Sequence, residues 1–275
     1  MQVDTLWQRA KGSLARMEDT YALTDHYAAV FDGATPKTAF RFPDGQTAGQ
    51  VAARCLAASV AHLSPTLSAR LAVDQLTLSV AASLVGKQGE ASGVIFSRHR
   101  REVWRVGDCP FAFVHTDGRL EEFRPLKRID AILSQWRASI VRSYLSRQLL
   151  TPRQILADDP GRAIIQPFIT RQVRYQNLPA PDSDGLSFGV FDGQAVPDRF
   201  VEVFPVPDDV PAVILASDGY PRLCPTLQES EAVLQQLLLA DPLCISSLLG
   251  TKALLPGNSS FDDRTFLKIL CSRAD

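Results

Sequence analysis

Tyr27-Ala28-Ala29-Val30-Phe31-Asp32-Gly33 is an apolar run that ends in an acid and a glycine, and Arg16-Met17-Glu18-Asp19 lies just upstream of it. We predict a strand over residues 13–23, with the acidic pair near its middle, and a buried strand over 27–31. A carboxylate at a strand end, followed by glycine, can present an acid and a bare backbone carbonyl to one point. Mg²⁺ and Mn²⁺ prefer oxygen ligands of this kind.

Asp-Gly is also a common turn, and further copies occur at 44–45, 117–118, 184–185 and 192–193. The metal hypothesis therefore requires partners for Asp32 at the ends of other strands. Three more acids meet this condition, since Asp108, Asp218 and Asp262 each adjoin a predicted strand. A plain turn or an exposed acidic pair is the alternative for each of these positions, and Asp108 could simply cap the turn between two strands.

Composition excludes several classes of protein. The chain has 275 residues, 45% hydrophobic and 21% charged, which is enough to bury a full core. The net charge of −1 gives no general reason to expect nucleic acid or an acidic membrane as a partner. The longest apolar stretch, 76–85, is too short for a membrane span, and Met1–Thr5 lacks a signal-peptide pattern.

The cysteines indicate the compartment. There are five, an odd number, and no two are spaced as CxxC, so neither a disulfide framework nor a zinc site is expected. We expect a cytoplasmic protein.

Hydrophobic periodicity predicts one domain over 1–275, with strands and helices in separate runs. We expect a polar edge at 1–11, an antiparallel meander of strands at 93–96, 102–106 and 111–114, and further strands at 200–204, 213–216 and 266–271. Helices are expected after Thr47, from Ser64-Pro65 to 85, and over 129–149, 152–157, 227–239 and 241–249.

The acids in order resemble the motifs of one family. The set is Glu18-Asp19, Phe31-Asp32-Gly33, Val106-Gly107-Asp108-Cys109, Ala216-Ser217-Asp218-Gly219 and Asp262-Asp263-Arg264-Thr265. In order, spacing and strand context, this set resembles the PPM-type metal-dependent protein phosphatases (the protein phosphatase 2C family), as a divergent, bacterial-like member. The resemblance implies an α+β fold, a four-layer α-β-β-α sandwich with two central antiparallel sheets flanked by helices, and a variable helical and flap region at about 126–199.

The resemblance also implies a metal site. Asp32 would bridge two Mg²⁺ or Mn²⁺ ions and Gly33 would offer its carbonyl, while Asp218 and Asp262 would ligate the second ion. Glu18 and Asp19 would hold metal-bound waters, and Asp108 would form a third, weaker site with Asp218. Such ions lower the pKa of water from ~15.7 towards neutrality, giving a hydroxide that attacks phosphorus directly. The implied substrate is a protein phosphorylated on serine or threonine.

The chain departs from the family pattern in three places. Leu14 stands where the family commonly has a phosphate-binding Arg, so Arg16, two residues on and roughly 6–7 Å along the expected strand, becomes the candidate for this catalytic role. Ala34-Thr35-Pro36 replaces the His-Gly-Gly of eukaryotic members, and Cys109 replaces a Ser. These departures leave two alternatives open: a catalytically weak or inactive regulatory binding module, and a hydrolase of non-protein phosphoesters.

Overall fold

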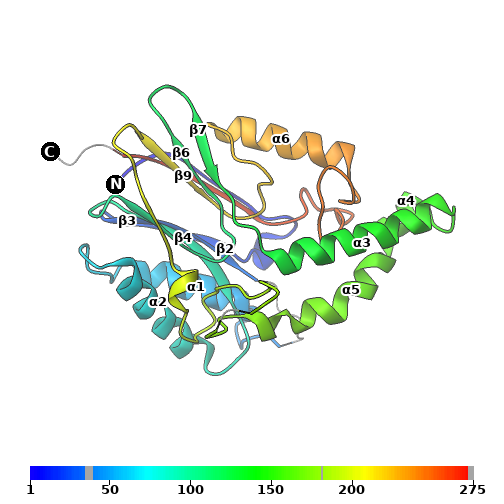
Figure 1. Ribbon diagram of the computed structural model, residues 1–275, viewed down its shortest axis with the longest axis horizontal. Helices are drawn as coiled ribbons and strands as arrows, with labels where there is room; N and C mark the ends of the chain where they lie inside the picture. Colours follow the sequence, from blue (N-terminus) through cyan, green and yellow to red (C-terminus); the bar gives the residue numbers. More distant parts are fainter. Residues whose placement is uncertain (35–39, 181, 272–275) are drawn as a thin grey trace.

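A computed structural model describes residues 1–34, 40–180 and 182–271, and Figure 1 shows two stacked β-sheets between helices. Both sheets have five strands, and every pair of neighbours is antiparallel. The first sheet runs β1 (Gln2–Arg9), β10 (Arg264–Leu270), β9 (Ala212–Ala216), β6 (Phe111–Val114) and β7 (Leu120–Phe123). The second runs β2 (Asp19–Leu23), β3 (Tyr27–Gly33), β4 (Ala91–Ser97), β5 (Glu102–Val106) and β8 (Glu202–Pro205).

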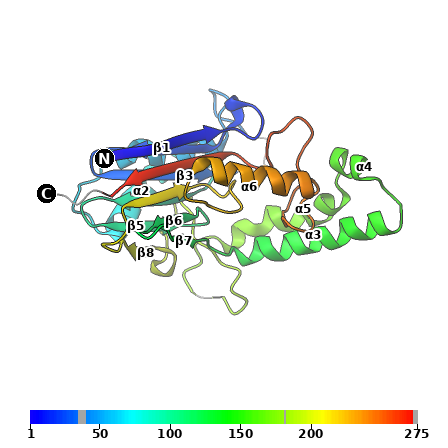
Figure 2. The same ribbon diagram turned by 90° about the horizontal axis from the view of Figure 1, so that it is seen from above.

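Helices cover the outer faces of both sheets (Figure 1). Helices α1 (Ala48–Val60) and α2 (Ala69–Leu84) pack on the second sheet, and α6 (Leu227–Ala240) lies over the first. Helices α3 (Arg128–Ser146), α4 (Pro152–Ala157) and α5 (Pro160–Arg171) form an arm that projects beyond the strand ends (Figure 2). Short 3-10 turns complete the helical segments at Leu14–Arg16, Gln172–Tyr175 and Asp198–Phe200. The predicted four-layer sandwich is confirmed.

Strand β3 shows why its sequence is apolar without alternation. Val30 packs between the two sheets with Val94 and Leu215, whereas Phe31 packs on the other face against α1 and α2. Successive side chains of a strand point to opposite faces, so a strand covered on both faces needs apolar residues at every position. This burial fixes the register that carries Asp32 to the end of the sheet.

The predicted meander is wrong in its last strand. Strands β4 and β5 pair as expected, but β6 pairs with β9 and β7 in the other sheet. The chain crosses between the sheets at Gly107-Asp108-Cys109, where Gly107 has φ +91° and a Cβ would lie 2.3 Å from Ser92 Oγ. A short loop usually indicates paired neighbours, but stacked sheets are only about 10 Å apart and a short loop can bridge them as well.

Other boundaries also differ from the prediction. Only Asp19–Leu23 of the expected 13–23 strand is a strand. The helix expected from Ser64-Pro65 begins at Ala69, after the N-cap Ser68, whose side chain accepts a hydrogen bond from Leu71 N. The polar 1–11 segment contains β1, an edge strand, and β7 was not predicted.

No helix forms at 241–249, where one was predicted. The Asp241 carboxylate instead accepts hydrogen bonds from the backbone N–H groups of Ile245, Ser246 and Leu248, at 2.6 to 3.2 Å. Asp favours such local bonds to the backbone, and they compete with helix formation.

Arg137 joins the arm to this same loop. Its side chain is fully buried and donates to the carbonyls of Leu243, Cys244 and Gly250 at 2.9 to 3.1 Å. It also forms an ion pair with Asp159, at 2.6 Å. The loop between α6 and β10 is thereby held against α3.

None of the helices in residues 1–34, 40–180 and 182–271 has both the length and the apolar character that crossing a bilayer demands.

Candidate functional site

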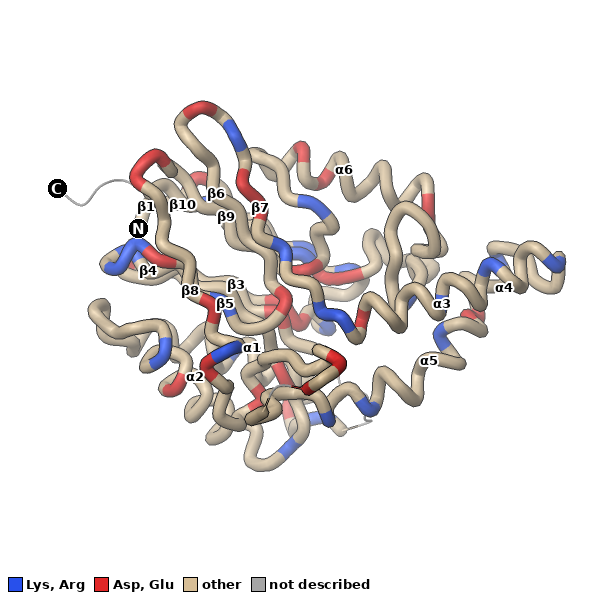
Figure 3. The backbone as a smooth tube through the Cα atoms, viewed as in Figure 1, with Lys and Arg blue, Asp and Glu red and all other residues tan. Residues whose placement is uncertain are grey.

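The strand ends of both sheets bring four of the predicted acids to one cavity, whereas Glu18 and Asp19 are buried beside it and are not in its described lining. Asp19 and Asp32 are cross-strand partners in β2 and β3, while Asp218 follows β9 and Asp262 precedes β10. The cavity has a volume of about 740 Å³ and lies between these strand ends and the arm. Its described lining includes Asp32, Gly33, Asp108, Asp218 and Asp262, and the cations Lys11, Lys127 and Lys252. Figure 3 shows acidic and basic segments next to one another beside the start of α3.

Three of the acids, Asp19, Asp32 and Asp218, form no ion pair with a lysine or arginine of the described chain, and burial raises their pKa values. Burial, and then repulsion by Asp19 and Asp218, raises the pKa of Asp32 well above its ordinary value. Burial and repulsion by Asp262 raise the pKa of Asp218 to about 7, and its buried Oδ1 accepts no hydrogen bond from any described residue. Burial raises the pKa of Asp19 to about 8, despite a hydrogen bond from Ser217 that lowers it. A bound cation would remove this penalty.

These shifts predict the pH dependence of the metal-free protein. The pKa values of Asp19, Asp32 and Asp218 are higher in the folded protein than in the unfolded chain. The stability that these protonated groups contribute is therefore present at low pH and is lost as the pH rises from about 4 to about 8. We expect the melting temperature in EDTA to fall between pH 5 and 8, and Asp19→Asn to flatten that slope. The exposed turn variant Asp117→Asn should keep the full slope. Equal slopes in both variants would contradict the assignment.

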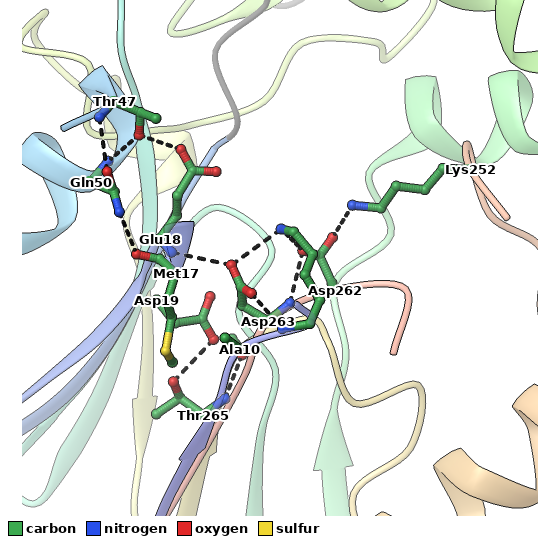
Figure 4. Close-up of polar contacts among 12 residues, drawn as sticks. Ala10, Met17, Glu18, Asp19, Thr47, Gln50, Lys252, Asp262, Asp263 and Thr265 are labelled. Carbon is green, nitrogen blue, oxygen red and sulfur yellow. Dashed lines mark hydrogen bonds and ion pairs between the residues drawn. The ribbon is translucent and has the colours of Figure 1, made fainter. Parts of the chain in front are cut away.

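Asp262 is different, because two lysines bind it. Its Oδ1 lies 2.8 Å from Lys11 Nζ and its Oδ2 lies 2.6 Å from Lys252 Nζ, as Figure 4 shows for Lys252. Lys11 Nζ also lies 3.2 Å from Asp263 Oδ2. Burial opposes ionisation, but the ammonium groups of Lys252 and Lys11 hold the pKa of Asp262 far below its usual range. The sequence pattern indicates neither lysine, since neither belongs to a motif.

Glu18 is held by the start of α1. Thr47 Oγ1 donates to Glu18 Oε1 at 2.5 Å, and Thr47 also forms a capping box with Gln50 (Figure 4). Gln50 Nε2 donates to the carbonyls of Ala15 and Met17, both at 3.0 Å. The helix cap thus fixes the segment that carries the acidic pair.

Replacing Thr47 tests this link. Thr47→Ala should destabilise the protein by about 1 kcal/mol, as loss of an N-cap does, and should also weaken Mn²⁺ binding because Glu18 Oε1 loses the hydrogen bond from Thr47 Oγ1. Thr226→Ala is the matched control, because Thr226 caps α6 with the same kind of box. Thr226→Ala should lower the free energy of unfolding, measured by urea denaturation, about as much as Thr47→Ala does. It should not change the affinity for Mn²⁺. Equal Mn²⁺ affinities in the two variants would contradict the link.

Asp108 lies at the crossover between the sheets. Ser92 Oγ donates to its Oδ1 at 2.5 Å, and Lys127 Nζ lies 3.8 Å from its Oδ2. Lys127 also pairs with Asp130 at 3.2 Å and lies over the Phe188 ring at 4.1 Å. A lysine therefore adjoins the position at which the resemblance implies a third ion.

Arg16 does not lie where a strand would have placed it. It belongs to the 3-10 turn Leu14–Arg16, is exposed, and is not among the described residues that line the cavity. Leu14 is also exposed, at 75%. Ala34-Thr35-Pro36 is the segment that stands in place of His-Gly-Gly. Ala34 donates its N–H to the Glu90 carbonyl at 3.0 Å, whereas Thr35 and Pro36 lie outside the described residues.

Gly33 and Cys109 are both explained by packing. A Cβ at Gly33 would lie 2.4 Å from the Gly49 carbonyl oxygen, so only glycine allows α1 to approach the end of β3. Cys109 is fully buried in the core between the sheets, and burial raises the pKa of its thiol. The change from Ser to Cys therefore places a small apolar group in the core.

The carboxylates of Asp32 and Asp218 fit a hard cation, whereas that of Asp262 does not. Asp32 and Asp218 supply carboxylate oxygens that no Lys or Arg in the described chain pairs with, and one of these oxygens is buried without a partner. Asp262 has an ammonium group on each oxygen. Among the described residues, no three His, Cys, Asp or Glu side chains already form a metal-ligand group. A cation at Asp32 and Asp218 would therefore draw further ligands from water.

Comparison with known proteins defines the fold class. No family model and no curated protein matches the chain. A crystal structure of a bacterial serine phosphatase carrying a point mutation is 12% identical, covers 99% of each chain and has a TM-score of 0.50. The Mycobacterium tuberculosis serine/threonine phosphatase PstP/Ppp is 15% identical over 97% of each chain, with a TM-score of 0.49. The PstP catalytic domain in complex with two manganese ions is 16% identical over 96% of each chain, with a TM-score of 0.47.

The chain thus has the fold of bacterial serine phosphatases. The PPM-type fold expected from the resemblance is confirmed, at low sequence identity.

Proposed function

We propose that this chain is an Mg²⁺- or Mn²⁺-dependent phosphatase that hydrolyses phosphoserine or phosphothreonine esters on proteins. The observation that supports this function is the meeting of Asp32 and Asp218, from two different sheets, in one cavity in which no described lysine or arginine forms an ion pair with either carboxylate. Carboxylates with strongly raised pKa values in a cavity are typical of functional sites. The cavity is also large enough for a phosphorylated side chain.

Each part of the site has a distinct role in this proposal. Asp32 and Asp218 would hold the cation, with the Gly33 carbonyl beside them. Asp19 and Glu18 would accept hydrogen bonds from water and fix its orientation. When bound, the cation supplies the acidified water that attacks phosphorus and the charge that stabilises the transition state. Residues 126–199, which include the arm and part of the cavity wall, would control which substrates enter.

The test is hydrolysis of p-nitrophenyl phosphate by the metal-stripped protein, with and without added Mn²⁺. We expect turnover that requires Mn²⁺ and that EDTA abolishes. A panel of phosphopeptides then assigns the substrate class, because hydrolysis of a non-protein phosphoester alone would point to the other hydrolase alternative. Absence of turnover with Mg²⁺ and with Mn²⁺ would contradict the proposal.

A regulatory binding module is the second candidate. The two lysines on Asp262 and the exposed position of Arg16 favour it, because both differ from what the resemblance implies for an active enzyme. Saturable phosphopeptide binding without turnover would support this candidate.

We also propose a cytoplasmic location. All five cysteines carry free thiols, as is usual in a reducing compartment. Labelling of the native protein in cells with a thiol reagent checks this state.

A further inference from the structure

The charges around the cavity are unevenly balanced. Asp262 and Asp263 lie next to each other, and Lys11 and Lys252 bring two positive charges to them through contacts of 2.6 to 3.2 Å. No described lysine or arginine forms an ion pair with Asp32 or Asp218. The cavity lining therefore includes one acid that two lysines pair with, Asp262, and two acids that no described lysine or arginine pairs with, Asp32 and Asp218.

We propose that Lys11 and Lys252 replace one of the divalent ions, so that the cavity binds a single ion, at Asp32 and Asp218. Two ammonium groups carry the same total charge as one divalent cation, and they occupy both oxygens of Asp262. The inference rests on the proposed function for the ion at Asp32 and Asp218. It departs from the two or three ions that the resemblance implies.

The backbone around Lys11 holds the lysine in place. Lys11 N donates to Asp263 Oδ1 at 2.8 Å, and the Lys11 carbonyl accepts from Ser259 N at 2.8 Å. Asp263 Oδ2 also accepts from Glu18 N at 3.2 Å. Lys11 is thus fixed on both sides before its ammonium reaches Asp262, which reduces the entropy lost in forming the pair.

Lys252 is also fixed by its neighbours. The carbonyl of Gly250 accepts from Arg137, and the carbonyl of Thr251 accepts from Arg162 at 3.0 Å. Leu254 N donates to the Pro242 carbonyl at 2.9 Å. The loop therefore presents Lys252 to Asp262 from a braced backbone.

Burial makes these pairs costly to separate. The side chains of Lys11 and Lys252 are only 22% and 30% exposed, and that of Asp262 is 25% exposed. A divalent ion at Asp262 would have to displace two ammonium groups into a confined cavity beside its own charge. At Asp218, by contrast, a buried oxygen has no hydrogen-bond partner among the described residues. The lowest-cost position for a cation is beside Asp218.

The experiment counts ions. Calorimetric titration of the metal-stripped full chain with Mn²⁺, checked by paramagnetic resonance of free Mn²⁺, should give one ion per chain. Asp218→Asn should weaken that binding at least about tenfold, as loss of a ligand does. The double variant Lys11→Met with Lys252→Met should gain a second, weaker ion. Lys252→Met alone provides a second measurement if the double variant does not fold.

Lys268→Met is the matched control. Lys268 also pairs with an acid, since its Nζ lies 3.5 Å from Asp4 Oδ2, but it does not line the cavity. It should keep one ion per chain.

Two ions in the wild type, no ion at all, or no second ion in folded lysine variants would overturn the inference. One ion without turnover would instead contradict the proposed function and leave the inference standing.

Discussion

Asp218→Asn should reduce kcat/KM for p-nitrophenyl phosphate by more than about a hundredfold at saturating Mn²⁺. Replacing a residue that only supports a metal ligand already lowers metal affinity or activity by about 10- to 100-fold, so replacing a ligand itself should lower activity more. The substitution keeps the shape of the side chain and removes its charge. Burial, and then repulsion by Asp262 and Asp108, raises the pKa of Asp218, so loss of that charge should not lower the melting temperature in EDTA.

Asp117→Asn is the control for this result. Asp117 also precedes a glycine, but it lies in an exposed turn outside the cavity. Its variant should retain the wild-type kcat/KM. Full activity in Asp218→Asn would contradict the whole assignment of the site, and a large loss with unchanged Mn²⁺ affinity would contradict its role as a ligand.

Arg137→Met should lower the free energy of unfolding by about 3–5 kcal/mol, the usual cost of breaking a buried ion pair by removing one partner. The substitution leaves Asp159, 13% exposed, without its cation. It also leaves three carbonyls at 243–250 without the donor they share. Urea denaturation measures the change.

Arg142→Met provides the comparison on the same helix. Arg142 is exposed and donates to one carbonyl in the same loop, that of Ile245. Its variant should lose at most about 1 kcal/mol, the net value of one hydrogen bond. Similar losses in both variants would show that Arg137 does not hold the arm to the loop.

The sequence predicted those parts of the fold that depend on local pattern. The continuous apolar run 27–31 gave a buried strand, and Thr47 and Thr151 capped helices as expected. The pairing of β6 could not be predicted, because the 107–109 loop is equally short whether it joins neighbours or crosses between sheets. Ser68 was missed as a cap because Ser64-Pro65 carries the stronger local signal.

The acids of the site were predictable because glycines and strand ends mark them. Lys11 and Lys252 were not predictable, because their contacts with Asp262 depend on how distant parts of the chain lie in the fold. Lys11 follows an edge strand whose side chains are mostly exposed, so its alternation is weak. Lys252 lies in a loop whose shape depends on Arg137, more than a hundred residues away. Arg16 was expected on a strand, and only the cap interactions of α1 show why a turn forms there.

The contacts around Asp19 and Glu18 join the two ends of the described chain. Thr265 Oγ1 donates to Asp19 Oδ2 across 246 residues, and Glu18 N donates to Asp263 across 245. During synthesis, the first acids leave the ribosome long before their partners are made. Until residues 263–265 have been made, Glu18 and Asp19 therefore lack these two contacts, and the acidic pair cannot take up the position that it has in the folded protein.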